Sequence, residues 1–556
     1  MPYPQQTLLD YIADGARECP NHPALLFKGS SITYTELEKL SDAFAAALTG
    51  LGVKKADRVA LLLPNCPQFI IAEIGAWKVG AIVAPLNPIY TEQELENSLS
   101  DCGAETIVTL TLFYKRIKAI QPHTKLKRVI ATNIKEYLPP ILRILFTLVK
   151  EKKGGHRIQL QPGDLWFGSL LNSNANAPRP SVSVGPDDPA IILRSGGTTG
   201  KPKGAVGLHR SFVASGLQLQ TWVKPMIADS NDIVMLVLPL FHVYANVGVQ
   251  SGAFVSRTPL SLIPNPRDLK DVLHTIRKVR PAFFSGVPTF FIGLLNHPDV
   301  KAGKFDFRSV KLCFSGAAPL MADTKTRFEE LTGGRIAEGY SLTEAMMACI
   351  INPVLGKKKV GSIGMPLPDV EVRVVDADTG EKILPIGEVG EILVRSPQNM
   401  VGYWQKEDET ALTMQVHGEG DPWLHTGDLG YMDEEGYVFI VDRKKDLIKT
   451  SGYQVWPREI EEVISLHPAV AEVGVAGVPD PIKGEVAKAW IILRSGMSAT
   501  EEEIRNHCRE RIAPYKVPAR VDFCKELPKS MIGKVLRRVL AEEERAKLAQ
   551  QHNLTG

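Results

Sequence analysis

The sequence is poor in features that would each define a particular class of protein. Its seven cysteines are odd in number and never spaced as CxxC, which argues against a disulfide framework and a zinc site. It contains no run of about 18–20 apolar residues, so no membrane-spanning helix is expected. Its first twenty residues lack the basic-then-apolar pattern of a secretion signal. We therefore expect a protein of the reducing cytoplasm.

A strong net charge is absent as well. The 65 basic and 62 acidic side chains leave +3, so no global field directs the protein toward nucleic acid or an anionic surface. The 46 glycines and 39 prolines are spread along the chain, which excludes collagen-like and disordered classes. With 44% apolar residues over 556 positions, the chain has the profile of a globular protein of several domains.

The first third alternates helix and strand patterns. Thr33-x-x-Glu36 and Thr91-x-x-Glu94 are capping boxes that open helices, and Pro67–Gly80 predicts another helix. Apolar strand runs are predicted at Arg58–Leu63, Ala81–Leu86, Ile107–Leu110 and Val129–Thr132. Apolar strands separated by helices indicate parallel strands covered on both faces, so the predicted fold class is α/β.

Two segments are predicted to connect larger parts. Residues 150–188 have little periodicity and are interpreted as a long surface connection. The charged run 442–446 (DRKKD) separates a strand at Val438–Val441 from everything that follows, which has the pattern of a small α+β unit. In that unit we expect a helix at Arg458–Leu466, strands near 471–478 and 486–493, and a helix near 499–511.

The strongest chemical signal is the run 195–204 (SGGTTGKPKG), which follows the apolar run Ala190–Leu193. Glycines allow backbone N–H groups to approach a polyanion, and hydroxyls and lysines add donors and positive charge. The run is not a Walker A loop, because Ser195 stands where the first glycine belongs and Pro202 follows Lys201. A phosphate-binding loop is therefore predicted; the alternative is a flexible Gly/Thr hairpin.

This loop resembles the phosphate loop of the adenylate-forming superfamily, which includes acyl-CoA synthetases, firefly luciferase and nonribosomal adenylation domains. The family's other signatures follow in order: Pro239–Ala245 (acyl pocket), Ser315–Pro319 (adenine turn), Glu338–Glu344 (adenine, phosphate and magnesium), Thr426–Asp428 (ribose), Asp442–Asp446 (hinge) and Pro528–Lys534 (catalytic lysine). The resemblance implies a large layered N-terminal adenylation domain over 1–441, with parallel sheets covered by helices. It also implies a hinge at 442–446 and a small mobile α+β domain over 447–556.

The resemblance also assigns site residues. The implied ATP contacts are Ser195, Gly196, Gly197, Thr198, Thr199, Gly200, Lys201, Gly316, Ala317, Ala318, Glu338, Gly339, Tyr340, Thr343, Asp428, Arg443 and Lys445. The implied catalytic residues are Lys534, His242, Thr343, Glu344 and Lys449, and the implied CoA contacts are Gly452, Tyr453 and Gln454. Mg²⁺ is expected at Ser195 and Glu344, with ATP and CoA as co-substrates.

Adenylation requires these residue types because a carboxylate must attack the α-phosphorus of ATP, so two anions must meet. Glu344 suits Mg²⁺, which prefers oxygen ligands, although a carboxylate at a helix N-terminus is an alternative. Asp428 suits the ribose hydroxyls, although it also fits a turn aspartate. Arg443 is the family's second ribose or phosphate contact, and alone it would be a solvated charge. Tyr340 offers a flat face to adenine or is simply core.

Two further roles follow from the resemblance. Lys534 would hold the attacking carboxylate and the α-phosphate together, whereas Arg537 and Arg538 are interpreted as parts of a solvated tail helix. His242, on an apolar strand end, would wall the acyl carboxyl site or be a core histidine. For thioester formation the small domain would rotate about Lys445, bringing the KTSGYQ segment (449–454), otherwise a hairpin, to the site.

Three positions depart from the family pattern. Arg194 stands where tyrosine is usual, Gly196 where many members have serine, and Ser341 where glycine is usual. Gly196 is common among fatty-acid members. Arg194 and Ser341 concern the conformation of the loop and the fit of adenine, and leave the reaction class unchanged.

The acyl substrate is indicated by two apolar segments. Residues 137–149 (YLPPILRILFTLV), followed by lysines, are too short to cross a bilayer; they either lie on one or pack on the domain. Residues 283–295 either line an acyl channel or form core. We expect an AMP-forming ligase of medium- or long-chain fatty acids, with a possible peripheral membrane contact. The alternatives are a coumarate-type aryl-CoA ligase and a stand-alone ligase that loads a carrier protein.

Overall fold

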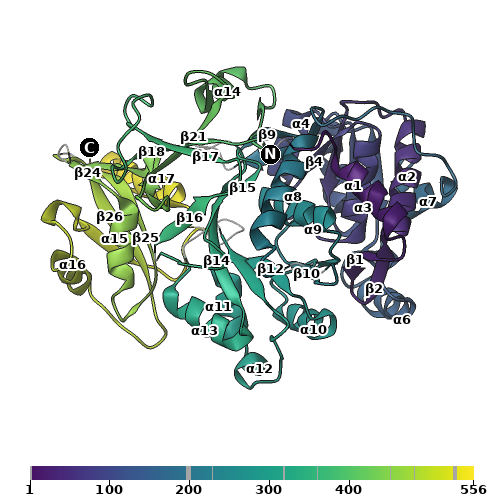
Figure 1. Ribbon diagram of the computed structural model, residues 1–556. Coiled ribbons are helices and arrows are strands. Elements are labelled where there is room, and N and C mark those ends of the chain that lie inside the picture. Colours follow the sequence, from purple (N-terminus) through teal and green to yellow (C-terminus); the bar gives the residue numbers. More distant parts are fainter. Residues whose placement is uncertain are drawn as a thin grey trace. The chain divides into compact units, whose positions relative to one another are not determined.

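The computed structural model describes residues 3–195, 202–227, 230–316, 320–359, 361–450, 453–480, 482–529 and 535–555 (Figure 1). The chain forms two compact units. The first contains Met1–Lys358, Gly364–Glu371 and Val394–Leu424, and the second contains Lys359–Ile363, Val372–Leu393 and His425–Gly556.

An eight-stranded sheet organises one half of the first unit. Its order is β19-β9-β8-β4-β3-β5-β6-β7. The bounds are β3 (Arg58–Leu62), β4 (Ile82–Pro85), β5 (Thr106–Leu110), β6 (Arg128–Thr132), β7 (Leu165–Trp166), β8 (Pro189–Ser195), β9 (Lys203–Leu208) and β19 (Gly402–Tyr403). The strands from β8 to β7 are parallel, while β9 and β19 pair antiparallel, so the predicted parallel α/β sheet is confirmed.

Helices accompany this sheet as the capping signals predict. They are α1 (Leu8–Glu18), α2 (Tyr34–Gly50), α3 (Pro67–Lys78), α4 (Glu92–Cys102), α5 (Tyr114–Ile120), α7 (Phe167–Ser173), α8 (His209–Val223) and α9 (Ser251–Ser256). Both predicted capping boxes form: the Thr33 hydroxyl accepts the N–H of Glu36 at 3.2 Å, and the Thr91 hydroxyl that of Glu94 at 3.3 Å. Every residue of α3 is buried, which makes this helix an interior element of the unit.

A second group of strands in the first unit follows the order β16-β15-β14-β13-β12-β10-β11-β1-β2. Their bounds are β1 (Pro23–Phe27), β2 (Ser30–Thr33), β10 (Val234–Leu236), β11 (Leu260–Leu262), β12 (Phe283–Gly286), β13 (Leu312–Ser315), β14 (Arg335–Leu342), β15 (Met347–Ile351) and β16 (Ser362–Pro366). Strands β1, β11, β10, β12, β13 and β14 are parallel neighbours. Helices α10 (Leu269–Val279), α11 (Pro288–Asn296), α12 (Pro298–Lys301) and α13 (Ala322–Thr332) lie together beside them (Figure 1).

The prediction that residues 150–188 form a long surface connection is partly wrong. It contains β7, which pairs parallel with β6, and the short helix α7. Phe167 of α7 is fully buried, and its ring lies 4.8 Å from that of Phe44 on α2. These elements escape a search for periodicity because the strand has two residues and the helix seven.

The second unit contains most of four neighbouring strands, in the order β17 (Glu371–Val375), β18 (Gly390–Arg395), β21 (Trp423–Met432) and β22 (Val438–Arg443). It also contains a five-stranded sheet of β24 (Tyr453–Val455), β23 (Ile448–Thr450), β26 (Gly484–Leu493) and β25 (Val470–Asp480), with β27 (Arg520–Phe523) on β26. Helices α15 (Pro457–Ser465), α16 (Glu501–Arg509) and α17 (Arg537–Thr555) complete it. The predicted helices and strands after residue 457 are confirmed to within a few residues.

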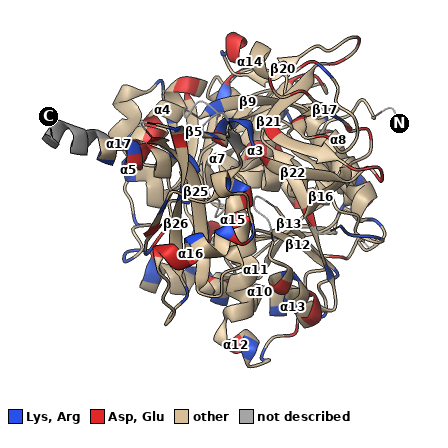
Figure 2. Ribbon diagram, turned by 90° about the vertical axis from the view of Figure 1, so that its left-hand side faces the viewer, with Lys and Arg blue, Asp and Glu red and all other residues tan. Residues whose placement is uncertain are grey.

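Basic and acidic residues both occur on helices and loops of these elements (Figure 2), and their totals of 65 and 62 nearly balance. In the part of the chain that is described, no helix has the length and apolar character needed to cross a bilayer.

Candidate active site

The phosphate-loop segment begins and ends in an antiparallel strand pair. Ser195, the last residue of β8, lies opposite Lys203 of β9 and is 3% exposed. The loop therefore joins two antiparallel strands, as the hairpin interpretation requires. Gly196, Gly197, Thr198, Thr199, Gly200 and Lys201 lie outside the described residues, so their contact with phosphate stays a prediction.

The Glu338–Glu344 segment runs along β14 and into the turn that joins it to β15. Glu338 and Gly339 are strand residues, Tyr340 is nearly buried in the same strand, and Thr343 and Glu344 follow in the turn. Because β15 pairs antiparallel with β14, no helix begins at Glu344. The helix-terminus alternative for this carboxylate is therefore wrong.

Tyr403 on β19 links the two segments, although it belongs to none of the motifs. Its hydroxyl donates to Oε1 of Glu344 at 2.8 Å. Burial raises the pKa of this phenol, the Glu344 carboxylate raises it further, and the Ser195 hydroxyl acts on it in the opposite direction. The phenol thus binds Glu344, and Ser195, 149 positions away in sequence, lies near enough to act on the pKa of the phenol. The two-residue strand that carries Tyr403 gives no pattern from which this role could be predicted.

The oxygen donors at this point suit Mg²⁺. They are the Ser195 hydroxyl and the half-buried Glu344 carboxylate, one oxygen of which Tyr403 already holds. Thr343 precedes Glu344 in the same turn. Within the described ranges no three His, Cys, Asp or Glu side chains cluster in a way that would hold a metal ion alone. Mg²⁺ needs only one or two protein ligands when nucleotide phosphates complete its coordination.

Arg194, the departure at the start of the loop, has a structural partner. It forms an ion pair with Asp101 near the end of α4, and its side chain is 11% exposed. The arginine therefore ties β8 to the helix that covers it.

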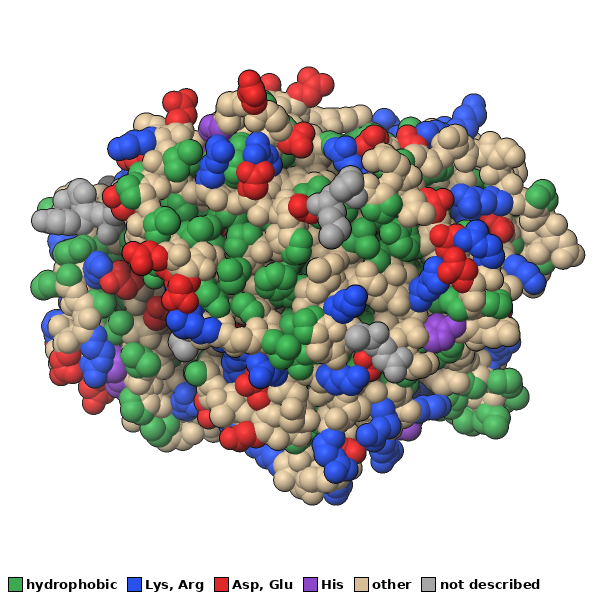
Figure 3. Space-filling model, viewed as in Figure 1, with side chains coloured by type: hydrophobic (Ala, Val, Ile, Leu, Met, Phe, Trp, Pro, Cys, Tyr) green, Lys and Arg blue, Asp and Glu red, His purple; other side chains and the backbone are tan. Residues whose placement is uncertain are grey.

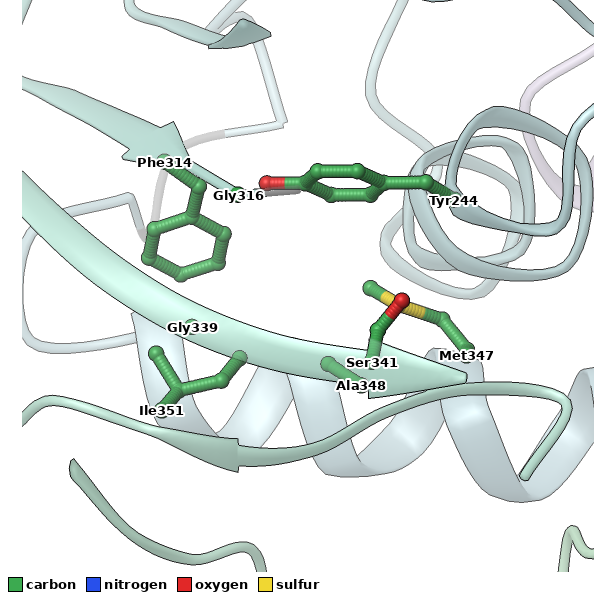
Figure 4. A pocket seen from close by; sticks show the side chains of 8 residues that line it. All are labelled: Tyr244, Phe314, Gly316, Gly339, Ser341, Met347, Ala348 and Ile351. Atoms are coloured by element: carbon green, nitrogen blue, oxygen red, sulfur yellow. The ribbon is translucent and has the colours of Figure 1, made fainter. Parts of the chain in front are cut away.

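Three of the predicted motifs line one small pocket, here called the first cavity. Figure 4 shows the Tyr244 ring and Gly316 on one side of the cavity, and Gly339, Ser341, Ala348 and Ile351 on the other. A Cβ added at Gly316 would lie 2.9 Å from the Tyr244 ring, so the absence of a side chain at this position makes room for the ring. The neighbouring Ala317 and Ala318 lie outside the described residues, so their contact with adenine stays a prediction.

A second, more apolar cavity shares two of its lining residues with the first. It is lined from α8, α9, β10 and β12, and includes Leu219, Val223, Val234, Val249, Ala253 and Phe283. Phe314 and Met347 line both cavities, so we interpret them as the partition between the two. Met347 has a φ of 120°, a strained backbone of the kind found at ligand sites. Sequence reasoning missed this partition, and of the 283–295 segment only Phe283 lines the cavity.

His242 lies in the loop after β10 rather than on a strand end, directly before a π-helical turn at Tyr244–Gln250. Its Nδ1 accepts the backbone N–H of Tyr244 at 3.3 Å. Burial lowers the pKa of this imidazole to about 4. The ring is therefore neutral at pH 7, with its proton on Nε2, and it adds no positive charge to the site.

A buried carboxylate supports the π-helical turn. Glu73 of α3 is fully buried and accepts hydrogen bonds from Nδ2 of Asn246 (2.7 Å) and Nε2 of Gln250 (2.6 Å). Burial raises the pKa of Glu73 to about 7, against the lowering effect of the two amides. The loop before the turn is fixed by Asn65, whose side chain binds the backbone of Leu238 and Leu240. The π-helical turn carries Tyr244, which lines the first cavity, and Val249, which lines the second. These hydrogen bonds attach the turn to the core of the unit.

In the second unit, Asp428 and Arg443 face each other across β21 and β22. Nε of Arg443 lies 3.0 Å from Oδ1 of Asp428, whose residue is 3% exposed. Asp428 stands within a ten-residue strand, so its interpretation as a turn aspartate is wrong. Arg443 is likewise an ion-paired strand residue and not a solvated hinge charge.

Glu391 of β18 is a further residue of this region that the motifs do not include. It is 3% exposed, binds Nζ of Lys444 at 2.9 Å and accepts the N–H of Gly427 at 3.2 Å. Burial alone would raise the pKa of Glu391, but His425 and Lys444 lower it below its usual value. The pKa of the neighbouring Lys445 is lowered by burial and by the charge of Arg443.

The remaining predicted residues lie in the C-terminal part of the second unit. Lys449 is exposed in β23, and Tyr453 and Gln454 are strand residues of β24 that pair with β23. This pairing agrees with the hairpin interpretation of their segment. Gly452 and Lys534 lie outside the described residues, so their roles stay predictions.

The interpretation of Arg537 as a solvated tail residue is wrong. Its guanidinium binds Oδ1 of Asp442 (2.6 Å) and Oε2 of Glu461 (2.5 Å), and its side chain is only 16% exposed. The Asp442 carboxylate also accepts the backbone N–H of Arg458. Arg537 therefore connects α17 to β22 and α15. Arg538, by contrast, is exposed and pairs with Glu542 one turn away, as expected.

Comparisons with known proteins agree with these features. The family model of the AMP-binding enzyme matches residues 12–404, and that of the AMP-binding enzyme C-terminal domain matches residues 459–534. A long-chain-fatty-acid–CoA ligase of Bacillus subtilis (strain 168) is 39% identical over 98% of this chain and 96% of its own. A 4-coumarate–CoA ligase 2 of Oryza sativa subsp. japonica is 34% identical over 98% and 92%. The crystal structure of the anthranilate CoA ligase AuaEII with anthranoyl-AMP has a TM-score of 0.83 at 27% identity and covers 99% of both chains.

Proposed function

The chain belongs to the AMP-binding enzyme family, and we propose that it is an ATP-dependent, AMP-forming acyl-CoA ligase whose acid is a medium- or long-chain fatty acid. The pair of adjoining cavities carries this proposal. The first is lined by Gly316, Gly339 and Ser341 of the nucleotide motifs together with apolar side chains, and the second mainly by aliphatic and aromatic side chains. A carboxylate at the first cavity would extend its chain toward the second, which is apolar as a fatty tail requires.

The first half-reaction follows from the charges at the site. A carboxylate oxygen of the acid bonds to the α-phosphorus of ATP, and the bond to pyrophosphate breaks. Mg²⁺, when bound with ATP, neutralises phosphate charge. Glu344 and Ser195 would hold it, with Tyr403 fixing the orientation of Glu344 by its 2.8 Å hydrogen bond. Neutral His242 would wall the acyl carboxyl group without pairing with it, and Lys534 would bridge the carboxylate and the α-phosphate.

The second half-reaction transfers the acyl group to CoA. The thiol sulfur bonds to the acyl carbon, and the bond to AMP breaks. Its residues would be Lys449, Gly452, Tyr453 and Gln454, presented after rotation of 447–556 about Lys445. Asp428 and Arg443 would bind the ribose hydroxyls of the adenylate, and their 3.0 Å ion pair supports this by holding the carboxylate in place.

The proposed cellular location and the proposed partners follow from the two co-substrates, ATP and CoA. ATP and CoA are cytoplasmic substrates, and all seven cysteines are free, as in a reducing compartment. We propose small-molecule substrates and no nucleic-acid partner, with the protein acting at the surface of a membrane rather than within one.

A coumarate-type aryl-CoA ligase is the second candidate, favoured by the rice relative. The second cavity distinguishes the two, because a planar aromatic acid would fill the first cavity and leave the second empty. A carrier-protein ligase is the third. The test is a panel of saturated fatty acids and hydroxycinnamic acids, with AMP and acyl-CoA both measured. Fatty acids should give both products; aromatic acids alone, or AMP without acyl-CoA, would support a rival.

A lysine variant tests the assignment of the two half-reactions. Lys534→Ala should abolish pyrophosphate release from ATP and fatty acid, yet largely retain thioester formation from supplied acyl adenylate and CoA. Arg538→Ala, which removes an exposed charge from the same region, is the matched control and should retain both. Equal loss of both half-reactions in Lys534→Ala would contradict the rotation about Lys445.

A further inference from the structure

The segment 140–150 presents a row of large aliphatic side chains to solvent. It consists of α6 (Pro140–Leu145) and a π-helical turn at Phe146–Lys150. The exposed side chains, here called the apolar ridge, are Ile141 (74%), Leu142 (43%), Ile144 (60%), Leu145 (50%), Leu148 (76%) and Val149 (56%). Figure 3 shows green side chains gathered at the lower right, where Figure 1 places α6. Exposure of so many neighbouring aliphatic side chains is unusual and marks an interaction surface.

The opposite face of the same segment is attached to the first unit. Nζ of Lys135 lies 3.2 Å from the Thr147 hydroxyl and 2.6 Å from Oε1 of Glu151. The Phe146 ring packs edge-on against His156, with 5.2 Å between centroids. Positions 141, 144, 145 and 148 therefore share the outer face of an anchored helix, at the i, i+3, i+4, i+7 spacing of an amphipathic one.

Basic residues stand within the ridge segment and directly after it in the sequence, and one of them, Arg143, donates to the backbone carbonyls of Lys135 and Glu136. Arg143, Lys150, Lys152, Lys153 and Arg157 are exposed, and we call these five residues the basic collar. The only carboxylate between residues 137 and 157 is Glu151, which is buried and paired with Lys135. Five cations against one anion give this stretch a charge of +4, in a chain whose total is only +3. Blue side chains lie beside the green group in Figure 3.

We propose that the apolar ridge and the basic collar form a docking surface for an anionic lipid bilayer. The eleven residues 140–150 span only about 16 Å, so the segment lies in the interface and does not cross it. Aliphatic side chains enter the boundary of the acyl chains while lysines and arginines meet anionic headgroups. Binding of a protein partner would not require this excess of positive charge, whereas binding of an anionic bilayer does. The surface itself stands on exposure and charge alone; a role in collecting membrane-dissolved acid rests in addition on the proposed function.

The test is cosedimentation of the full chain with vesicles of phosphatidylcholine, with and without phosphatidylglycerol. Wild type should bind the anionic vesicles, and binding should weaken as salt is raised. The double variant Ile144→Asp/Leu148→Asp should lower the partition coefficient at least about tenfold, since two buried aliphatic side chains are lost. Lys152→Glu/Lys153→Glu should lower binding about tenfold or more to anionic vesicles only.

Leu412→Asp is the matched control. Leu412 is a leucine of α14 (Glu407–Thr413) that is 72% exposed and lies outside the ridge, so this variant should bind like wild type. Pyrophosphate release from a short, water-soluble acid shows that each variant is folded. The proposal is overturned if the ridge variant binds like wild type, if Leu412→Asp loses as much, or if the ridge variant instead converts a dimer to a monomer in light scattering.

Discussion

Replacement of Glu73 tests whether this buried carboxylate supports the π-helical turn that carries Tyr244. The carboxylate is fully buried, and its only partners among the described residues are the amides of Asn246 and Gln250. Its pKa in the folded protein is about 7, against 4.5 for an exposed glutamate. The folded state therefore binds a proton that the unfolded state has lost between pH 4.5 and 7. Stability must fall as pH rises through that window, by about 3 kcal/mol in total.

Glu73→Gln should remove this pH dependence. Oε1 of Gln250 is buried without a hydrogen-bond partner within the described residues, so this amide can turn over and accept from the new side-chain NH₂. Nδ2 of Asn246, which also donates to the carbonyl of Leu240, can go on donating to the remaining carbonyl oxygen of the new side chain. His209, whose pKa burial lowers to about 4, gives the opposite pH dependence but is common to both proteins and cancels.

The assay is the thermal midpoint of both proteins by calorimetry from pH 4.5 to 8. From pH 4.5 to 8 the thermal midpoint of Glu73→Gln should rise by several degrees relative to that of wild type. The reason is that wild type loses about 3 kcal/mol of unfolding free energy over this range and the variant does not. Glu92→Gln, which replaces an exposed glutamate of α4, should stay parallel to wild type. A difference between Glu73→Gln and wild type that does not change with pH would refute the buried ionisation of Glu73.

Three further substitutions probe the site and its support. Glu344→Gln should slow pyrophosphate release on the order of 10²–10³-fold and raise the Mg²⁺ concentration needed for half-maximal rate; an unchanged Mg²⁺ dependence would exclude a metal role. Met347→Ala should merge the two cavities and raise kcat/KM for long relative to short fatty acids about tenfold, a ratio that is independent of stability; uniform loss at all lengths would argue against the partition. Arg537→Ala leaves two largely buried carboxylates unpaired and should cost about 3–5 kcal/mol of unfolding free energy, against less than about 1 kcal/mol for the exposed Arg538→Ala; similar midpoints in thermal unfolding would contradict the ion-pair network.

Local signals in the sequence predicted the local structure well. Thr33 and Thr91 cap the helices they were expected to cap, because a capping box is complete within four residues. The apolar strands of the parallel sheet were also predictable, since burial on both faces leaves a continuous apolar run. Residues 165–173 were not, because a two-residue strand and a seven-residue helix carry too little periodicity.

Long-range contacts account for what sequence reasoning missed. Tyr403 lies 59 positions from Glu344, and Arg537 lies 95 from Asp442, so no spacing along the chain relates them. The partition by Phe314 and Met347 depends on the register of β13, β14 and β15, which is set only when the sheet forms. The family motifs name the residue types at the site, whereas these contacts determine how the side chains are held.

The central claim, that a fatty-acid carboxylate attacks the α-phosphorus of ATP, is tested most directly by isotope transfer. The enzyme is incubated with ATP, Mg²⁺, CoA and a long-chain fatty acid labelled with ¹⁸O in both carboxyl oxygens. Mass spectrometry of the AMP should then show one ¹⁸O atom on its phosphate, with none in pyrophosphate. Unlabelled AMP, or ¹⁸O appearing in any other phosphate product, would contradict the mechanism.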